Sequence, residues 1–170
     1  MRYLIVSDIH GSVSGANRTK DLVKKENPDV LIILGDILHG ARDEDDLHVA
    51  SILLSLPCGL LLVKGNCDYS SDENILKTSL PTSRRLDFGL HSVYLMHRPP
   101  YVSFPINDLV MHGHTHVKRL EKVEGVYYFN PGSISLPRDD GPGYGLFDGK
   151  RISLYDALTY ELIASEALNY

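Results

Sequence analysis

RYLIVSDIHGS, from Arg2 to Ser12, is the stretch that decides the fold of this 170-residue chain. Its first five residues are β-prone and mostly apolar, and a Gly/Ser cluster follows them, so the stretch predicts a buried strand that ends near Val6. Asp8 and His10 come just past the carboxyl end of that strand, where open α/β sheets form their ligand sites. A carboxylate and an imidazole suit a first-row divalent cation, so the loop is a candidate metal site.

An apolar run followed by a polar loop recurs along the first half of the chain. VLIIL at 30–34 and LLLV at 60–63 have strand length, and they lead into Gly35-Asp36 and Gly65-Asn66. Segments 14–27 and 43–56 carry helix signals, namely a nearby serine and a following Pro28 for the first and an acidic start for the second. Alternating strands and helices predict right-handed βαβ units in the N-terminal half.

The second half of the chain is dominated by short strand candidates. Strands are expected at 85–88, 92–96 and 108–111, with His97 and the stretch HGHTH at 112–116 following two of them. Hairpins are expected at 119–129 and 144–155. Three prolines between His97 and Asp108 argue against a helix there. We therefore expect an α/β (α+β) fold, a two-sheet β-sandwich flanked by helices, as one domain over residues 1–170 with its polar loops on one rim.

The composition is that of an ordinary globular protein, with 43% hydrophobic and 23% charged residues. The net charge of −5 disfavours a nucleic-acid partner. Two cysteines are too few for a disulfide framework, and no run approaches the roughly 18 apolar residues of a membrane span. We expect a cytoplasmic protein without a membrane partner, and the sequence leaves homo-oligomerisation open.

Five predicted strand ends present oxygen or imidazole donors. Each donor alone is more often a capping or hydrogen-bonded residue, and it is the agreement of five loops that favours a metal site. One ion could not use so many ligands, whereas two ions that share a carboxylate could. The expected ligands are Asp8, His10, Asp36, Asn66, His97, His114 and His116, with Asp36 as the shared carboxylate.

The order D-x-H, G-D, G-N-x-D, H, G-H-T-H and N-P-G-S, from Asp8 to Ser133, resembles the calcineurin-like metallophosphoesterases. More narrowly, it is similar to the small single-domain YfcE-type phosphodiesterases. The resemblance implies a β-sandwich flanked by helices and a bridging hydroxide that attacks phosphorus in line. It also implies two divalent ions, with manganese expected first and zinc, iron, nickel or magnesium as alternatives. The implied ligands are Asp8, His10 and His116 for one ion and Asn66, His97 and His114 for the other, with Asp36 bridging both.

This chain departs from the family pattern at two positions. Many members have, after G-N, a histidine that protonates the leaving oxygen, whereas this chain has Cys67, whose thiol is a poor hydrogen-bond donor. We hypothesise that His39 partly replaces that acid, and an inert Cys67 is the alternative to a reactive one. After His97, where the family usually has glycine, the chain has Arg98, a possible phosphate contact like Arg42. The alternatives for these arginines are a restricted loop and a solvated surface.

The expected function is that of a metal-dependent phosphoesterase acting on a small phosphoester, with phosphodiesters as the first choice. Catalytic roles are assigned to Asp36, Asn66, His39 and Cys67, and substrate contacts to Arg98 and Arg42. The first alternative is a phosphomonoesterase or nucleotide pyrophosphohydrolase on the same site. The second is a non-catalytic scaffold like a retromer subunit, but every ligand position of the pattern is filled here, which argues against it.

Overall fold

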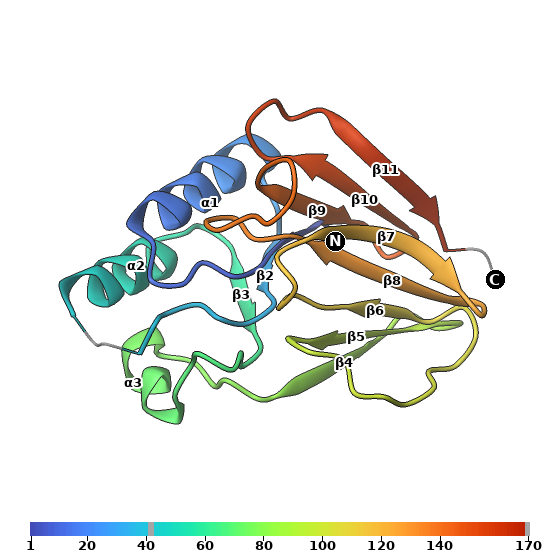
Figure 1. Ribbon diagram of the computed structural model, residues 1–170, viewed down its shortest axis with the longest axis horizontal. Coiled ribbons are helices and arrows are strands. Elements are labelled where there is room, and N and C mark those ends of the chain that lie inside the picture. The colour runs from blue at the N-terminus through green and yellow to red at the C-terminus, as the bar shows by residue number, and fades with distance from the viewer. Residues whose placement is uncertain (41–42, 169–170) are drawn as a thin grey trace.

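Two β-sheets stack face to face, and helices cover the outer face of the first one (Figure 1). The computed structural model describes residues 1–40 and 43–168. Within these residues the first sheet has the strand order β11-β10-β9-β1-β2-β3, and the second has the order β4-β5-β6-β8-β7. The expected sandwich flanked by helices is therefore confirmed.

The N-terminal half consists of the βαβ units that the sequence predicted. Its elements are β1 (Tyr3–Val6), α1 (Val13–Glu26), β2 (Val30–Ile33), α2 (Glu44–Leu54) and β3 (Gly59–Leu62), and the three strands run parallel. Ser12 caps α1 by accepting a hydrogen bond from the Gly15 N–H, and Asp43 caps α2 in the same way from Asp46. Both helices begin within one residue of the start expected from these caps.

The middle of the chain builds the second sheet. Its elements are a 3₁₀ turn η1 (Ser70–Asp72), α3 (Glu73–Leu76), β4 (Ser83–Asp87), β5 (Ser92–Met96), β6 (Leu109–Met111), β7 (Lys118–Val123) and β8 (Val126–Pro131). Strands β5, β6 and β8 run parallel, and β4 and β7 pair antiparallel with their neighbours at the two edges. No helix forms between His97 and Asp108, as the prolines predicted, whereas η1 and α3 were not expected.

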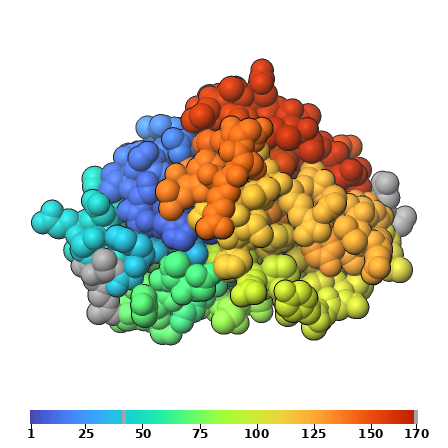
Figure 2. All heavy atoms as spheres, in the orientation of Figure 1, coloured from blue at the N-terminus to red at the C-terminus, as the bar shows by residue number. Residues whose placement is uncertain are grey.

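The C-terminal strands return to the first sheet. β9 (Gly143–Phe147) pairs antiparallel with β1, and β10 (Arg151–Asp156) and β11 (Leu162–Ala167) continue from it. The chain between β8 and β9 crosses the face shown in Figure 2 as an orange band beside the blue N-terminal elements. β11 was not expected, because this half-exposed edge strand lacks a clear apolar alternation.

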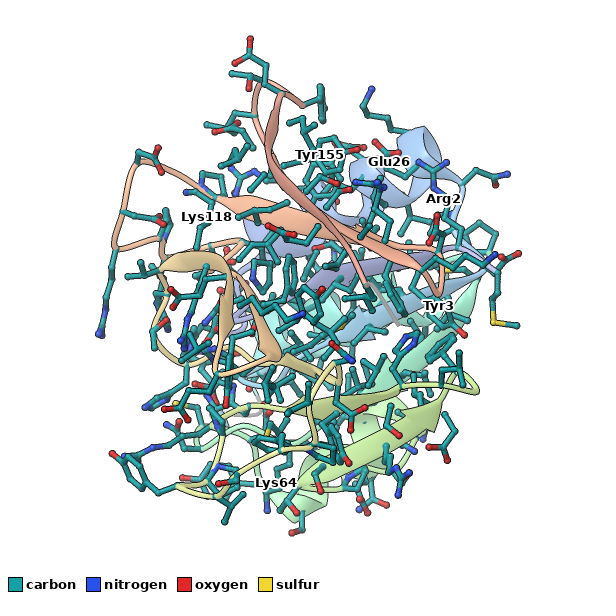
Figure 3. All side chains as sticks on the ribbon, turned by 90° about the vertical axis from the view of Figure 1, so that its right-hand side faces the viewer. Arg2, Tyr3, Glu26, Lys64, Lys118 and Tyr155 are labelled. Carbon is teal, nitrogen blue, oxygen red and sulfur yellow. The ribbon has the colours of Figure 1, made fainter. Side chains whose placement is uncertain are left out.

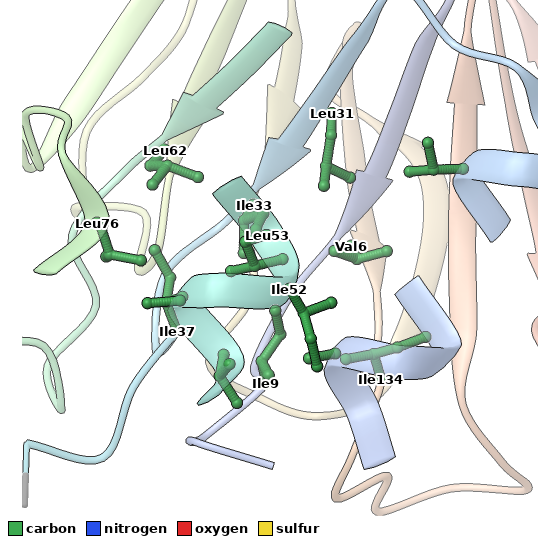
Figure 4. Close-up of a cluster of buried hydrophobic side chains, with 14 of the residues drawn as sticks. Val6, Ile9, Leu31, Ile33, Ile37, Ile52, Leu53, Leu62, Leu76 and Ile134 are labelled. Carbon is green, nitrogen blue, oxygen red and sulfur yellow. The ribbon is translucent and has the colours of Figure 1, made fainter. Parts of the chain in front are cut away.

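The core has two layers, one on each face of the first sheet. In β1, Tyr3 (labelled in Figure 3) and Ile5 face the second sheet. Leu4 and Val6, on the other face of the same strand, pack against the helices. The helix-side layer joins β1 and β2 to Ile52 and neighbouring residues of α2 (Figure 4). Each fully buried aliphatic side chain contributes about 1.5–3 kcal/mol. This packing fixes the parallel strands so that their carboxyl ends meet at one rim.

The longest helix in the described part of the chain, α1, has 14 residues. A bilayer-spanning helix needs about 20 residues, most of them apolar. No helix in the ranges 1–40 and 43–168 is therefore able to cross a membrane.

Candidate metal centre

The loops after β1, β2, β5 and β6 are joined by backbone hydrogen bonds at this rim. The Asp8 N–H donates to the Gly35 carbonyl (3.1 Å), and the His10 N–H donates to the Asp36 carbonyl (2.8 Å). The Gly113 N–H donates in turn to the carbonyl of His97 (3.0 Å). The expectation that the polar loops share one rim is confirmed for these loops.

The backbone of this rim adopts an unusual conformation. Five of the seven expected ligands have φ angles in the left-handed region, which residues other than glycine rarely adopt. Such residues cost on the order of 1–3 kcal/mol each and cluster at functional sites. The five are Asp8 (56°), His10 (52°), Asp36 (49°), His114 (70°) and His116 (60°). The fold therefore holds these side chains in place at an energetic cost, as expected of a functional site.

Asp8 is completely buried, and only one of its carboxylate oxygens is hydrogen-bonded. Oδ2 accepts hydrogen bonds from the Ser7 hydroxyl (2.6 Å) and the His114 N–H (3.2 Å). Oδ1 has no hydrogen-bond partner among the described residues and lies 3.2 Å from His116 Nε2 and 3.7 Å from His10 Nε2. A buried carboxylate oxygen in this state is costly, and a cation between it and the two imidazoles would satisfy it.

The two imidazoles beside Asp8 present the ring nitrogens that a metal would use. His116 Nδ1 donates to the Leu136 carbonyl (2.7 Å), so in the neutral ring Nε2 carries the free lone pair. That Nε2 lies 3.1 Å from His10 Nε2. The ligand atoms of Asp8, His10 and His116 all lie within 4.8 Å of one another, so these residues fit a divalent ion.

Asp36 lies between this group and the rest of the site. Its Oδ1 accepts from the Cys67 N–H (2.8 Å), while Oδ2 lies 3.6 Å from His10 Nε2 and 3.2 Å from His97 Nε2. Burial alone would raise the pKa of Asp36, but His97 and the Cys67 N–H lower it to about 2. The carboxylate is therefore ionised at neutral pH and lies between His10 and His97, and its role as a shared ligand stays a prediction.

Three further predicted ligands meet on the other side of Asp36. His97 Nδ1 donates to the Leu34 carbonyl (2.7 Å), which turns Nε2 toward Asn66 Oδ1 (3.1 Å). Burial opposes protonation of His97, yet Asp36 raises its pKa, because several acceptor atoms converge on Nε2. The His114 ring packs edge-on against His97 with centroids 5.2 Å apart, and burial lowers the pKa of His114. A cation would satisfy the acceptors around His97 Nε2, and ligand atoms of Asp8, Asp36 and His97 lie within 4.8 Å of one another. His114 belongs to no such group among the described residues, so its place as a ligand stays a prediction.

Cys67 lies within the site and carries its proton. Its Sγ, a carboxylate oxygen of Asp36 and a ring nitrogen of His10 lie within 4.8 Å of one another. Burial, followed by the charge of Asp36, raises the pKa of Cys67 to about 11. The Asn66 side-chain amide donates to the sulfur (3.4 Å). At neutral pH the structure therefore presents a neutral thiol beside the shared carboxylate.

His39 faces the start of α2 rather than the group around Asp36. Its Nδ1 lies 2.7 Å from Asp46 Oδ1, and its Nε2 lies 3.4 Å from Asp43 Oδ2. The hydrogen bond to Asp46 raises the pKa of His39, although burial opposes the shift. Arg98 lines a cleft together with His114, and Arg42 lies outside the described residues.

Asp68 links two of the ligand loops by hydrogen bonds, a role that was not predicted from the sequence. Its Oδ1 accepts from the N–H groups of Ile37 (2.8 Å) and Leu38 (3.1 Å), which follow Asp36. Its Oδ2 accepts from the Gly65 N–H (2.8 Å), just before Asn66. The available signal was a carboxylate two residues after Asn66 in a glycine-containing loop, where backbone N–H groups need acceptors.

The N-P-G-S stretch supports the ligand loops, as expected. The Asn130 amide donates to the Gly113 carbonyl (2.8 Å) and to the Thr115 hydroxyl (3.0 Å), which lie on either side of His114. The Ser133 hydroxyl donates to the Asp8 carbonyl (2.7 Å). These contacts link the end of the second sheet to the loop after β1.

Known proteins share both the pattern and the fold of this chain. Residues 1–151 match the model of the calcineurin-like phosphoesterase superfamily domain. The chain is 30% identical to phosphodiesterase YfcE of Escherichia coli (strain K12), with 99% of each chain covered. It is 28% identical to the probable metallophosphoesterase YsnB of Bacillus subtilis (strain 168), with 64% of this chain and 76% of that protein covered.

Solved structures of related proteins have the same fold as this chain. A structure of the E. coli phosphoesterase YfcE superposes with a TM-score of 0.89 at 28% identity and covers 99% of this chain and 100% of that chain. Zinc-bound Vps29 from Entamoeba histolytica has a TM-score of 0.69 at 18% identity, over 99% of this chain and 100% of that chain, which shows a shared fold alone. With the family model spanning most of its length, the chain belongs to the calcineurin-like phosphoesterase superfamily and is a metal-dependent hydrolase of phosphate esters.

Proposed function

We propose that this chain is a phosphodiesterase with a two-metal centre, formed as one domain over residues 1–170 and acting on small phosphoesters in the cytoplasm. One ion is held by Asp8, His10 and His116, the other by Asn66, His97 and His114, and Asp36 serves both. The observation that carries the proposal is the buried Oδ1 of Asp8, which accepts no hydrogen bond from the described residues and faces two imidazole nitrogens. When bound, two such ions activate water for in-line attack and neutralise the charge on phosphorus.

Neighbouring groups of this chain orient the proposed ligands and keep the Asp36 carboxylate ionised. Asp36 stays ionised far below neutral pH, and His97 and His116 are fixed by backbone carbonyls that leave each Nε2 facing the site. Manganese is the ion proposed first, on the resemblance to the family, and the carboxylate, amide and imidazole donors accept zinc, iron, nickel or magnesium as well. Cys67 keeps its proton but donates weakly, so leaving groups that need little help from an acid are the preferred ones.

The proposal predicts metal-dependent cleavage of diesters over monoesters. Chelator-stripped protein is assayed on bis(p-nitrophenyl) phosphate and on p-nitrophenyl phosphate after addition of manganese, zinc, nickel or magnesium. We expect turnover of the diester with manganese, a much slower reaction of the monoester, and no turnover without metal. Faster monoester cleavage would favour the phosphomonoesterase alternative. If elemental analysis shows bound metal but neither substrate is cleaved, the result would favour the alternative of a non-catalytic scaffold.

We further propose that His39 is the acid for poor leaving groups, which requires its imidazole to turn from Asp43 and Asp46 toward the metal centre. Asp46 raises the pKa of His39, so the imidazole stays protonated to a higher pH than a free histidine. An acid works only while protonated, so cleavage of a diester with an alkyl leaving group should slow as the pH rises through that raised pKa. We expect His39→Gln to lose this alkaline fall and to slow the alkyl diester more than bis(p-nitrophenyl) phosphate. Equal effects on both substrates would contradict the role.

A further inference from the structure

A cleft of about 780 Å³ opens beside Asn66, His97 and His114. A cavity of this size encloses a whole drug-sized molecule, so it is larger than a phosphate group requires. Its remaining walls come from the loops after β3 and β5 and from the residue before β4. They are Lys64, Gly65, Asp68, Tyr69, Thr82 and Arg98.

Two cations of this cleft have no carboxylate partner among the described residues. Lys64 Nζ donates to the hydroxyl of Ser70 (3.0 Å), and Figure 3 labels Lys64 at the lower edge of the molecule. Arg98 is exposed and lines the cleft together with His114. The Asp68 carboxylate, which also lines the cleft, is occupied by three backbone N–H groups. In a chain with a net charge of −5, these free cations indicate a site for a second anionic group.

Tyr69 offers an aromatic ring at the wall of this cleft. Its N–H donates to Asp72 Oδ2 (2.8 Å), and Asp72 is fully buried. Its ring lies so close to Gly40 that a Cβ added there would be 2.2 Å from Cε2. Nevertheless 60% of Tyr69 is exposed. An aromatic ring that is largely exposed at the wall of a cleft is suited to stacking on a flat group such as a nucleobase.

We propose that this cleft binds nucleotide-type phosphodiesters that carry a second phosphate, of which a 5′-phosphorylated dinucleotide is the simplest. The scissile diester would lie at the metal ligands, a base would stack on Tyr69, and Arg98 with Lys64 would hold the 5′-phosphate. The inference rests on the proposed function, because it places the scissile group at the proposed metal centre. In hydrolysis the oxygen of water bonds to phosphorus and the bond to the 3′ oxygen breaks. That alkyl oxygen is a leaving group that needs an acid, and it takes its proton from His39, the proposed acid for such groups. Thus pTpT yields two molecules of thymidine 5′-phosphate.

The test compares pTpT with TpT, which differ only in the 5′-phosphate. Binding is followed by NMR shift titration of the metal-free protein, in which nothing is cleaved. We expect pTpT to bind about tenfold more tightly than TpT, as a charge-assisted contact provides. Arg98→Gln combined with Lys64→Gln should remove this ratio, whereas Lys24→Gln, which removes a lysine of α1 instead, should keep it. Tyr69→Leu should lower the affinity for pTpT and for TpT by the same factor.

The outcomes separate this inference from the proposed function. Equal affinities for pTpT and TpT, or a preference that survives loss of both Arg98 and Lys64, would overturn the inference. Hydrolysis of bis(p-nitrophenyl) phosphate by the manganese-loaded protein tests the proposed function independently, because that diester carries no second phosphate. If that hydrolysis fails, the affinity ratio in the metal-free protein still decides whether the cleft recognises the 5′-phosphate.

Discussion

Asp36→Ala is expected to lower kcat/KM for bis(p-nitrophenyl) phosphate on the order of a thousandfold, to the level of the metal-free protein. The reason is that the Asp36 carboxylate lies between the two proposed ligand groups. Its Oδ2 is 3.2 Å from His97 Nε2 in one group and 3.6 Å from His10 Nε2 in the other. Without this carboxylate the two ions would repel one another across the site. The protein should therefore bind fewer than two manganese ions, as measured by elemental analysis after gel filtration.

The control for this variant removes a carboxylate elsewhere on the chain. Asp21→Ala removes an exposed acidic residue of α1, whose 4.0 Å ion pair with Lys24 is worth little, and should retain activity. Circular dichroism and urea unfolding establish that Asp36→Ala is folded. A folded Asp36→Ala protein that keeps turnover within tenfold of the wild type would refute the shared-ligand role.

Gly65→Ala is expected to damage the same site without replacing any proposed ligand. A Cβ at this position would lie 2.1 Å from Asp36 Oδ1 and 2.2 Å from the backbone nitrogen of Asp36. Because a backbone atom cannot rotate away, the loop after β2 or the loop after β3 must shift. We expect a loss of about 1–3 kcal/mol in the free energy of unfolding. Activity should fall about a hundredfold, since misplacement by 1 Å has effects of this size.

Gly59→Ala is the matched control, six residues earlier at the start of β3. A Cβ there would meet its nearest atom, Cγ2 of Val30, at an ordinary 3.5 Å. This variant should keep both stability and activity. The measurements are urea unfolding and manganese-dependent hydrolysis of bis(p-nitrophenyl) phosphate. If Gly59→Ala and Gly65→Ala have equal stability and equal activity, the close approach of Gly65 to Asp36 is not required for either property.

Much of this architecture is encoded locally and was predictable from the sequence. Strands 30–34 and 92–96 are apolar runs bounded by turn residues, and the helices are bounded by capping residues, so short-range patterns suffice to find them. The polar residues after the strands were predictable as one site, because parallel strands bring their carboxyl ends to the same rim. The resemblance to the family then assigned a role to each position.

Contacts between distant residues were not predictable in this way. β11 forms because β10 offers an unpaired edge, and its own residues carry a weak strand signal. Asp68 is just another loop carboxylate in the sequence, and only the folded chain brings Ile37, Leu38 and Gly65 to its two oxygens. The orientation of His39 toward Asp46 likewise depends on how α2 packs beside the loop after β2.

The sequence by itself determined the order of β1 to β10 and of α1 and α2, together with the candidate ligands, since these follow from residue type and spacing along a strand or loop. It did not predict η1, α3 or β11. The tertiary structure alone decided which atoms meet. It set the left-handed backbone at Asp8 and Asp36, the approach of Gly65 to Asp36, and the cleft that brings Tyr69 and Arg98 to one site. The physical reason is that these features depend on packing between segments far apart in the chain, and no local pattern of residues reports such packing.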